Sequence, residues 1–155
     1  MRRNLLMLLT LCIVAFPAIA QNRTYMVGKK TALVAGAETI TVQLPAAAKR
    51  TVGFTGASVY CSAECEFTVE RDGTLATTTG VMPIPLNLAD EWGTANAFYS
   101  SNAGVGKVIA RHIVPAGQTL VMELTGKTLV AGQNFTLRTS SVTATVVINV
   151  QWREN

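Results

Sequence analysis

The clearest pattern of apolar and polar positions along the chain lies between Thr143 and Arg153. Polar and apolar side chains alternate there, and Val147 is the only apolar residue among the polar positions. The apolar positions are Ala144, Val146, Ile148, Val150 and Trp152. Because successive side chains of a strand point to opposite faces, this run predicts a strand with one buried side and one solvent-facing side.

Shorter runs of the same kind occur upstream and are separated by turn residues. They predict strands over residues 38–44, 51–60, 65–71, 74–79, 107–114, 119–125 and 135–140. The pair Asp72-Gly73 predicts a tight hairpin turn that joins the strand 65–71 to the strand 74–79, because glycine accepts a positive φ. Gly53 and Gly56 predict a bulge or a close backbone approach.

These runs together predict the fold class. About eight to ten short strands, with turns roughly every ten residues and no amphipathic helix of useful length, are typical of an all-β domain. We expect a two-sheet antiparallel β-sandwich of jelly-roll type, formed as a single domain by residues 38–155. An Ig-like sandwich is the alternative, although the cysteine and tryptophan spacing of true Ig domains is missing.

Residues 1–20 have the three parts of a secretory signal peptide. Arg2 and Arg3 precede an apolar run, Leu5–Phe16, which ends in small residues. The run is too short for a transmembrane span, which needs roughly 20 apolar residues. We therefore expect cleavage after Ala20, export to the periplasm or the extracellular space, and no membrane span in the mature chain.

Loss of the signal peptide changes the charge of the chain. The full sequence has 155 residues, with 13 basic and 9 acidic side chains. The mature chain would have 135 residues and 11 basic side chains, which leaves a net charge of +2. That length suits one domain with a real core. So small a charge does not indicate a nucleic-acid partner.

Residues 21–37 have a weaker pattern than the rest of the mature chain. Thr24–Val27 could form a short first strand, and Lys29-Lys30 is expected to face solvent. Gly36 interrupts the apolar run that follows. We interpret 21–37 as an N-terminal segment that forms a short strand or adds to the sheet of a neighbouring subunit.

Two cysteines, Cys61 and Cys65, lie in the mature chain. In an oxidising compartment two cysteines this close in sequence most simply pair with each other, and the bond would staple a turn. Three intervening residues do not match a thioredoxin-type motif. With His112 as the only histidine, the two cysteines do not make a zinc site. We expect no metal and no cofactor.

No catalytic constellation stands out in the sequence. There is no Gly-x-Ser-x-Gly motif, and His112 lies in a strand pattern without an evident partner. Glu66 and Glu70 share one strand face but would be roughly 13 Å apart. We interpret both as solvated charges of an edge strand. A non-enzymatic protein is therefore expected, and a small secreted hydrolase is the least favoured alternative.

The irregular segment 80–106 holds the candidate binding site. Pro83 and Pro85 prevent a regular central strand, and long irregular segments often carry function. Aromatic faces on loops can stack on sugar rings or anchor a protein partner. The candidate binding residues are Trp92, Phe98 and Tyr99, with Asp90 beside them. The alternative is that the segment is only a connection and its aromatic side chains fill the core.

Two kinds of function are compatible with these features. The first is an exported, non-catalytic β-sandwich that acts through surface contacts, as an assembly subunit or adhesive module of the bacterial envelope or extracellular space. Its partner would be itself or another envelope protein. The second is a carbohydrate-binding module that holds a glycan on the aromatic residues of segment 80–106.

Overall fold

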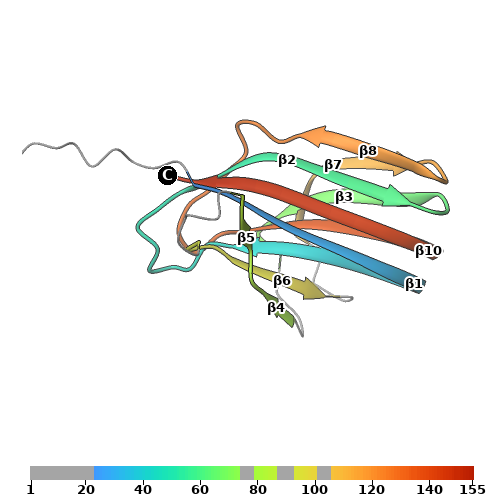
Figure 1. Cartoon of the computed structure of the whole chain (residues 1–155), viewed down its shortest axis with the longest axis horizontal. Helices are drawn as coiled ribbons and strands as arrows, with labels where there is room; N and C mark the ends of the chain where they lie inside the picture. Colours follow the sequence, from blue (N-terminus) through green and yellow to red (C-terminus); the bar gives the residue numbers. More distant parts are fainter. Residues whose placement is uncertain (1–22, 74–78, 87–92, 101–105) are drawn as a thin grey trace, which may run out of the picture.

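The computed structural model describes residues 23–73, 79–86, 93–100 and 106–155, and these ranges contain ten strands and no helix (Figure 1). The strands are β1 (Arg23–Gln43), β2 (Val52–Cys61), β3 (Cys65–Arg71), β4 (Thr79–Val81), β5 (Ile84–Pro85), β6 (Asn96–Ser100), β7 (Lys107–Val114), β8 (Gln118–Glu123), β9 (Thr128–Leu129) and β10 (Asn134–Glu154). The described part of the chain contains no helix long and apolar enough to cross a membrane.

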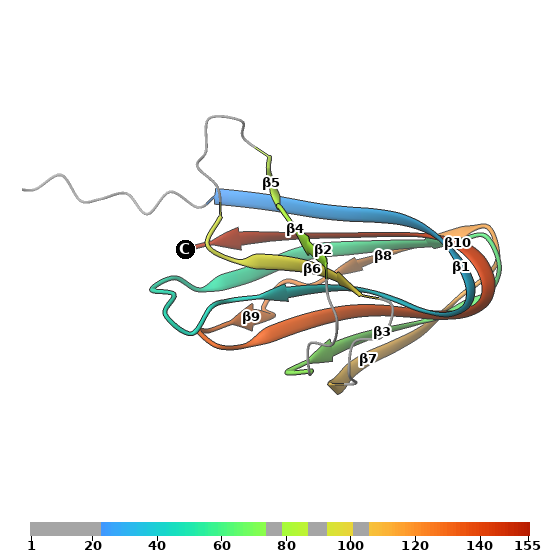
Figure 2. The ribbon, with the colours of Figure 1, turned by 90° about the horizontal axis from the view of Figure 1, so that it is seen from below.

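Two long strands, β1 and β10, organise the molecule. They pair antiparallel in one register from Arg23 opposite Glu154 to Gln43 opposite Asn134. Both strands curve over at one end of the molecule, so that each belongs to two layers (Figure 2). The residue ranges 24–27, 31–37 and 38–44, which the sequence presents as separate runs, are therefore parts of one continuous strand up to Gln43.

The two layers have matching strand orders. In the first sheet, the C-terminal half of β10 lies between β1 and β2, and β8 forms the far edge. In the second sheet, the N-terminal half of β10 lies between β1 and β3, and β7 forms the far edge. One antiparallel ribbon is thus rolled over onto itself, which is the jelly-roll arrangement. The predicted β-sandwich of jelly-roll type is confirmed, and the Ig-like alternative is not.

The core lies between the inner faces of the two sheets. The five apolar positions predicted for the inner side of the last strand are all buried, as are Ile40, Val42, Phe67 and Val69. Tyr25 stacks on Trp152 with ring centroids 6.1 Å apart, and Phe54 stacks on Phe135 at 4.1 Å. Burial of such aromatic side chains supplies much of the hydrophobic stabilisation of a small domain.

Residues 23–37, from the segment interpreted as short or exchangeable, form the first part of β1. Tyr25 and Val27 of this part belong to the buried core. The first part of β1 pairs with residues 140–154 of β10, from Ala37 opposite Ser140 to Arg23 opposite Glu154. It is therefore built into the sandwich of the same molecule, and its residues 23–31 lie in the first sheet.

One element prediction is wrong. The strand 65–71 was expected to form a hairpin with 74–79, but β3 pairs with β10 on one side and with β7 on the other. No edge of β3 is left for a third strand. Thr79 belongs to β4, which pairs with β6, and residues 74–78 lie outside the described residues. The bulge predicted near Gly56 is confirmed, because Thr55 is the extra residue where the β2–β10 register shifts.

Candidate functional site

Between β3 and β7, the described strands β4, β5 and β6 lie on the β1 side of the molecule, and we call these strands and the described residues that adjoin them the insertion. Ile84 and Pro85 pair with Met26 and Tyr25 in the first half of β1, and β6 pairs with Thr39–Gln43 in the second half. β4 then pairs with β6. The described strands of this insertion therefore cover parts of the β1 edge in both sheets.

An open hollow is lined by residues 80–83 and by residues of the stretch 93–98, which belong to β4, β6 and their flanking segments, and we call it the β4–β6 groove. Its volume is about 560 Å³, which is within the range of small-molecule sites. Its apolar lining includes Val81, Met82, Pro83 and Phe98. Met82 is 64% exposed, and the nearby Ile84 and Leu86 are also exposed. The groove thus presents apolar surface to solvent.

The predicted binding residues do not form one aromatic surface in the described structure. Phe98 lines the β4–β6 groove. The neighbouring Tyr99 packs against the core, and its hydroxyl donates a hydrogen bond to the carbonyl of Gly28. Side chains of adjacent strand residues point to opposite faces, so the two rings separate. Trp92 and Asp90 lie outside the described residues.

Tyr99 is held in place by charged neighbours on β1. The Lys29 ammonium lies 4.7 Å from the Tyr99 ring centroid and forms an ion pair with Glu38 at 3.0 Å. Burial and the nearby Glu38 charge raise the pKa of the Tyr99 hydroxyl above its ordinary value. Tyr99 therefore remains a neutral hydrogen-bond donor at physiological pH.

Glu154 fixes one wall of the β4–β6 groove. Its buried carboxylate accepts hydrogen bonds from the backbone N–H groups of Thr94 at 2.7 Å and Ala95 at 2.8 Å. A Cβ atom added to Gly93 would lie 2.7 Å from the Glu154 carboxylate, so glycine permits this close approach. The alternation of the last strand could have identified Glu154, because it continues the inward-facing positions one step beyond Trp152.

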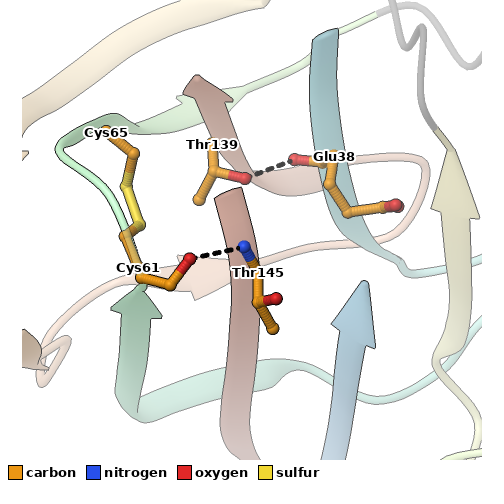
Figure 3. The surroundings of a disulfide bond; sticks show 6 residues. Glu38, Cys61, Cys65, Thr139 and Thr145 are labelled. Carbon is orange, nitrogen blue, oxygen red and sulfur yellow. Dashed lines mark hydrogen bonds between the residues drawn. A yellow bond between two sulfur atoms is a disulfide. The ribbon is translucent and has the colours of Figure 1, made fainter. Parts of the chain in front are cut away.

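The predicted bond between Cys61 and Cys65 is present, with Cα atoms 6.3 Å apart. Cys61 ends β2 in the first sheet and Cys65 begins β3 in the second, so the stapled turn is a crossover between sheets. Ser62 in this turn exchanges two hydrogen bonds with the backbone of Thr145, at 2.8 and 2.9 Å. Figure 3 shows the disulfide beside Thr145 and beside Thr139, which donates a hydrogen bond to the Glu38 carbonyl.

The interpretation of Glu66 and Glu70 as solvated edge charges is wrong for Glu70. Its side chain is 1% exposed and accepts hydrogen bonds from Arg138 at 2.7 and 3.2 Å. Thr68 and the N–H of Gly106 also donate to it, each at 3.0 Å. Glu66 pairs with Arg111 at 3.2 Å and is 35% exposed. Neither is on an edge, because β3 is an inner strand.

The outer face of the second sheet is largely buried where the sequence pattern predicts solvent. Thr41 and Thr136 hydrogen-bond to each other at 2.8 Å across β1 and β10. The buried polar residues at these outward positions are Thr39, Thr41, Thr68, Glu70 and Thr136. The alternation of polar residues therefore predicts correctly which side chains point away from the core. It does not predict whether those side chains are exposed to solvent.

The far edges of both sheets contrast with the covered β1 side. Within the described residues, β7 pairs only with β3 and β8 only with β2, and we call these two strands the open edge. Val121 on β8 is 76% exposed and Ile113 on β7 is 58% exposed. Val108 and Ile109 are also exposed. Unpaired strand edges with apolar side chains are sites where another chain can add.

The chemistry of the described residues is sparse. No group of three or more His, Cys, Asp or Glu side chains within them is placed to hold a metal ion. His112 lies on β7, opposite Phe67 of β3.

A comparison with protein-family models finds no match, and a comparison with curated proteins finds no similar sequence. Within the described residues, the open edge and the β4–β6 groove are therefore the surfaces best suited to contact a partner or a ligand.

Proposed function

We propose that this protein is an exported, non-catalytic β-sandwich that acts by surface contact, as a subunit of an envelope or extracellular assembly. The signal-peptide pattern of residues 1–20 supports export. The Cys61–Cys65 disulfide adds weaker support, because such bonds persist in oxidising compartments.

The open edge is the observation that carries the proposal. Natural sheets usually protect their edges with charges, proline, bulges or covering segments. Here the insertion covers the β1 side, while β7 and β8 present exposed aliphatic side chains along adjoining edges of the two sheets. An added strand from another subunit would bury these side chains and pair the free backbone groups.

The mass of the mature chain in solution tests this proposal. Residues 21–155, purified from the periplasm or the medium, would be measured by light scattering over a dilution series. We expect species larger than a monomer that dissociate on dilution. A monomer at every concentration, with no partner retained from the envelope fraction, would contradict assembly as the function.

The β4–β6 groove favours a second candidate, the recognition of a glycan or another small ligand. Its apolar lining and its volume suit a ligand that stacks on Phe98. A glycan array would test this, with Phe98→Ala as the loss-of-binding variant. Tyr99→Phe is the matched control, because the Tyr99 side chain points away from the groove that Phe98 lines. The substitution also keeps the aromatic ring. Binding that survives Phe98→Ala would rule out the groove as the site.

A further inference from the structure

The two strands of the open edge are not equally available for pairing. β7 carries the exposed cations Lys107 and Arg111, and its register with β3 shifts so that Ile109 is an extra residue. Charges and bulges of this kind discourage the addition of a strand. β8 has no bulge against β2, where Gln118–Glu123 pairs in one register with Gly56–Cys61. It also lacks proline and lysine, and Glu123 is its one charged residue.

The backbone of β8 is oriented for an added strand. The N–H of Leu124, next to Glu123, donates to the carbonyl of Thr55 on β2 at 3.4 Å. Because antiparallel strands turn their backbone groups to each side alternately, Leu120 and Met122 also direct theirs toward β2. The N–H and C=O groups of Thr119, Val121 and Glu123 then face the open side.

We propose that β8 pairs antiparallel with β8 of a second copy of this chain, around a two-fold axis at Val121. This inference rests on the proposed function and names the partner of the open edge. In this register Val121 lies opposite its own copy, and Thr119 lies opposite Glu123. The first sheets of the two molecules would join into one continuous sheet.

The sequence of β8 is complementary to itself in this register. The one charged residue, Glu123, meets a neutral threonine, and the two Glu123 residues are separated by roughly 14 Å along the strands. Leu120 lies opposite Met122, so apolar side chains also meet on the inner face. A charged peptide would find no row of opposite charges on β8. These features favour a second copy over a charged partner.

Val121→Lys tests the pairing without disturbing the monomer, because the Val121 side chain faces solvent. In the dimer two lysines would lie directly opposite each other, and like charges in that position destabilise a strand pair. We expect light scattering to show a dissociation constant at least roughly tenfold higher than for the wild type. Ile113→Lys on β7 is the matched control and should leave the dissociation constant unchanged.

Cysteine cross-linking tests the register. Hydrogen-bonded residues on antiparallel strands have Cα atoms about 5.5 Å apart, which suits a disulfide. Val121→Cys should therefore form a covalent dimer under mild oxidation, whereas Glu123→Cys should not, because its copies lie too far apart. Efficient cross-linking through Glu123→Cys alone would overturn the Val121 axis.

The outcomes separate this inference from the proposed function. If the wild type assembles and Val121→Lys assembles equally well, the β8 pairing is wrong while assembly as a function stands. If Ile113→Lys loses assembly and Val121→Lys does not, the interface lies on β7, and this result also overturns the β8 pairing. A wild type that stays monomeric and retains no envelope partner would overturn both.

Discussion

Glu66 and Glu70 on β3 each pair with an arginine, but they differ in burial. Glu70 is almost fully buried with Arg138, whereas Glu66 and Arg111 are both partly exposed. Removal of one partner from a buried pair leaves an uncompensated charge and costs about 3 kcal/mol or more. An exposed pair contributes about 0.5 kcal/mol or less. We therefore expect Glu70→Gln to lower the free energy of unfolding far more than Glu66→Gln, as measured by urea denaturation at neutral pH. Equal effects of the two variants would contradict the assigned burial.

The carboxylate of Glu70 should also make the stability of the protein depend on pH. Burial alone would raise the pKa of Glu70, but the hydrogen bonds from Arg138, Gly106 and Thr68 and the Arg138 charge hold it below its usual value of 4.5. The stabilisation from Glu70 is therefore fully present above that value, and it is lost as the pH falls through the lowered pKa of the folded state. We expect the difference in unfolding free energy between wild type and Glu70→Gln to shrink below about pH 4.5. A difference that stays constant from neutral pH to about pH 3 would count against this linkage.

Glu154 is the residue that attaches the insertion to the end of β10. Glu154→Ala would leave the N–H groups of Thr94 and Ala95 without their acceptor, which should cost about 2 kcal/mol or more. Amide hydrogen exchange at Thr94 and Ala95 should become faster in the variant. Arg50→Gln serves as the control, because Arg50 is partly exposed and lies 4.0 Å from the Glu154 carboxylate. Unchanged exchange at both amides would show that Glu154 does not anchor the insertion.

At the scale of elements, the disulfide stabilises a crossover that other contacts also hold. The bond closes a loop of about five residues, so its entropic contribution should be about 2 kcal/mol. We expect the double variant Cys61→Ala, Cys65→Ala to lose about that much unfolding free energy and to keep its β-sheet circular dichroism. Wild type in reducing agent should show the same midpoint as the double variant. Loss of the native sheet signal in both would show that the crossover depends on the disulfide.

The sequence pattern predicted where strands lie better than it predicted which strands pair. Alternation identified β2, β3, β7, β8, the second half of β1 and both halves of β10, because burial of one face selects apolar residues at every second position. The Asp72-Gly73 turn misled the prediction, because a local turn signal does not say which strands occupy the neighbouring edges. Asp72 does have the positive φ typical of such a turn, at 56°, but β3 is already paired on both sides.

At the scale of the whole molecule, pairings distant in sequence could not be predicted from the pattern. β1 and β10 pair with each other, although they are the first and the last strand in the described part of the chain. Arg23, at the start of β1, lies opposite Glu154, at the end of β10. Nothing in either run identifies its partner, and the sequence presents each strand as separate runs rather than as one strand that passes through two sheets. For the same reason the sequence could not reveal that the Tyr99 hydroxyl meets Gly28 of β1, or that Glu70 meets Arg138.

The first half of β1 is the segment that the sequence pattern presents as exchangeable between subunits. If residues 21–37 only added to the sheet of a neighbouring subunit, their deletion would abolish oligomers and leave the fold intact. The structure predicts otherwise, because the deletion would remove Tyr25 and Val27 from the core and would uncover Trp152. It would also leave the C-terminal half of β10 without the partner on one side. Loss of these two core side chains and of a paired strand costs an amount comparable with the roughly 5–15 kcal/mol that stabilises a typical domain.

We therefore expect the chain that starts at residue 38 to lack cooperative thermal unfolding, as measured by circular dichroism. A synthetic peptide of residues 21–37, added in excess, tests whether the missing half-strand can be supplied by another molecule. Restored cooperative unfolding would mean that the first sheet accepts this strand in trans, so that exchange of β1 becomes a second route of assembly beside the proposed β8 pairing. A truncated chain that unfolds cooperatively without the peptide would show that Tyr25 and Val27 are dispensable. A peptide carrying Tyr25→Ala is the control, because it keeps the backbone pairing but cannot restore the stack on Trp152.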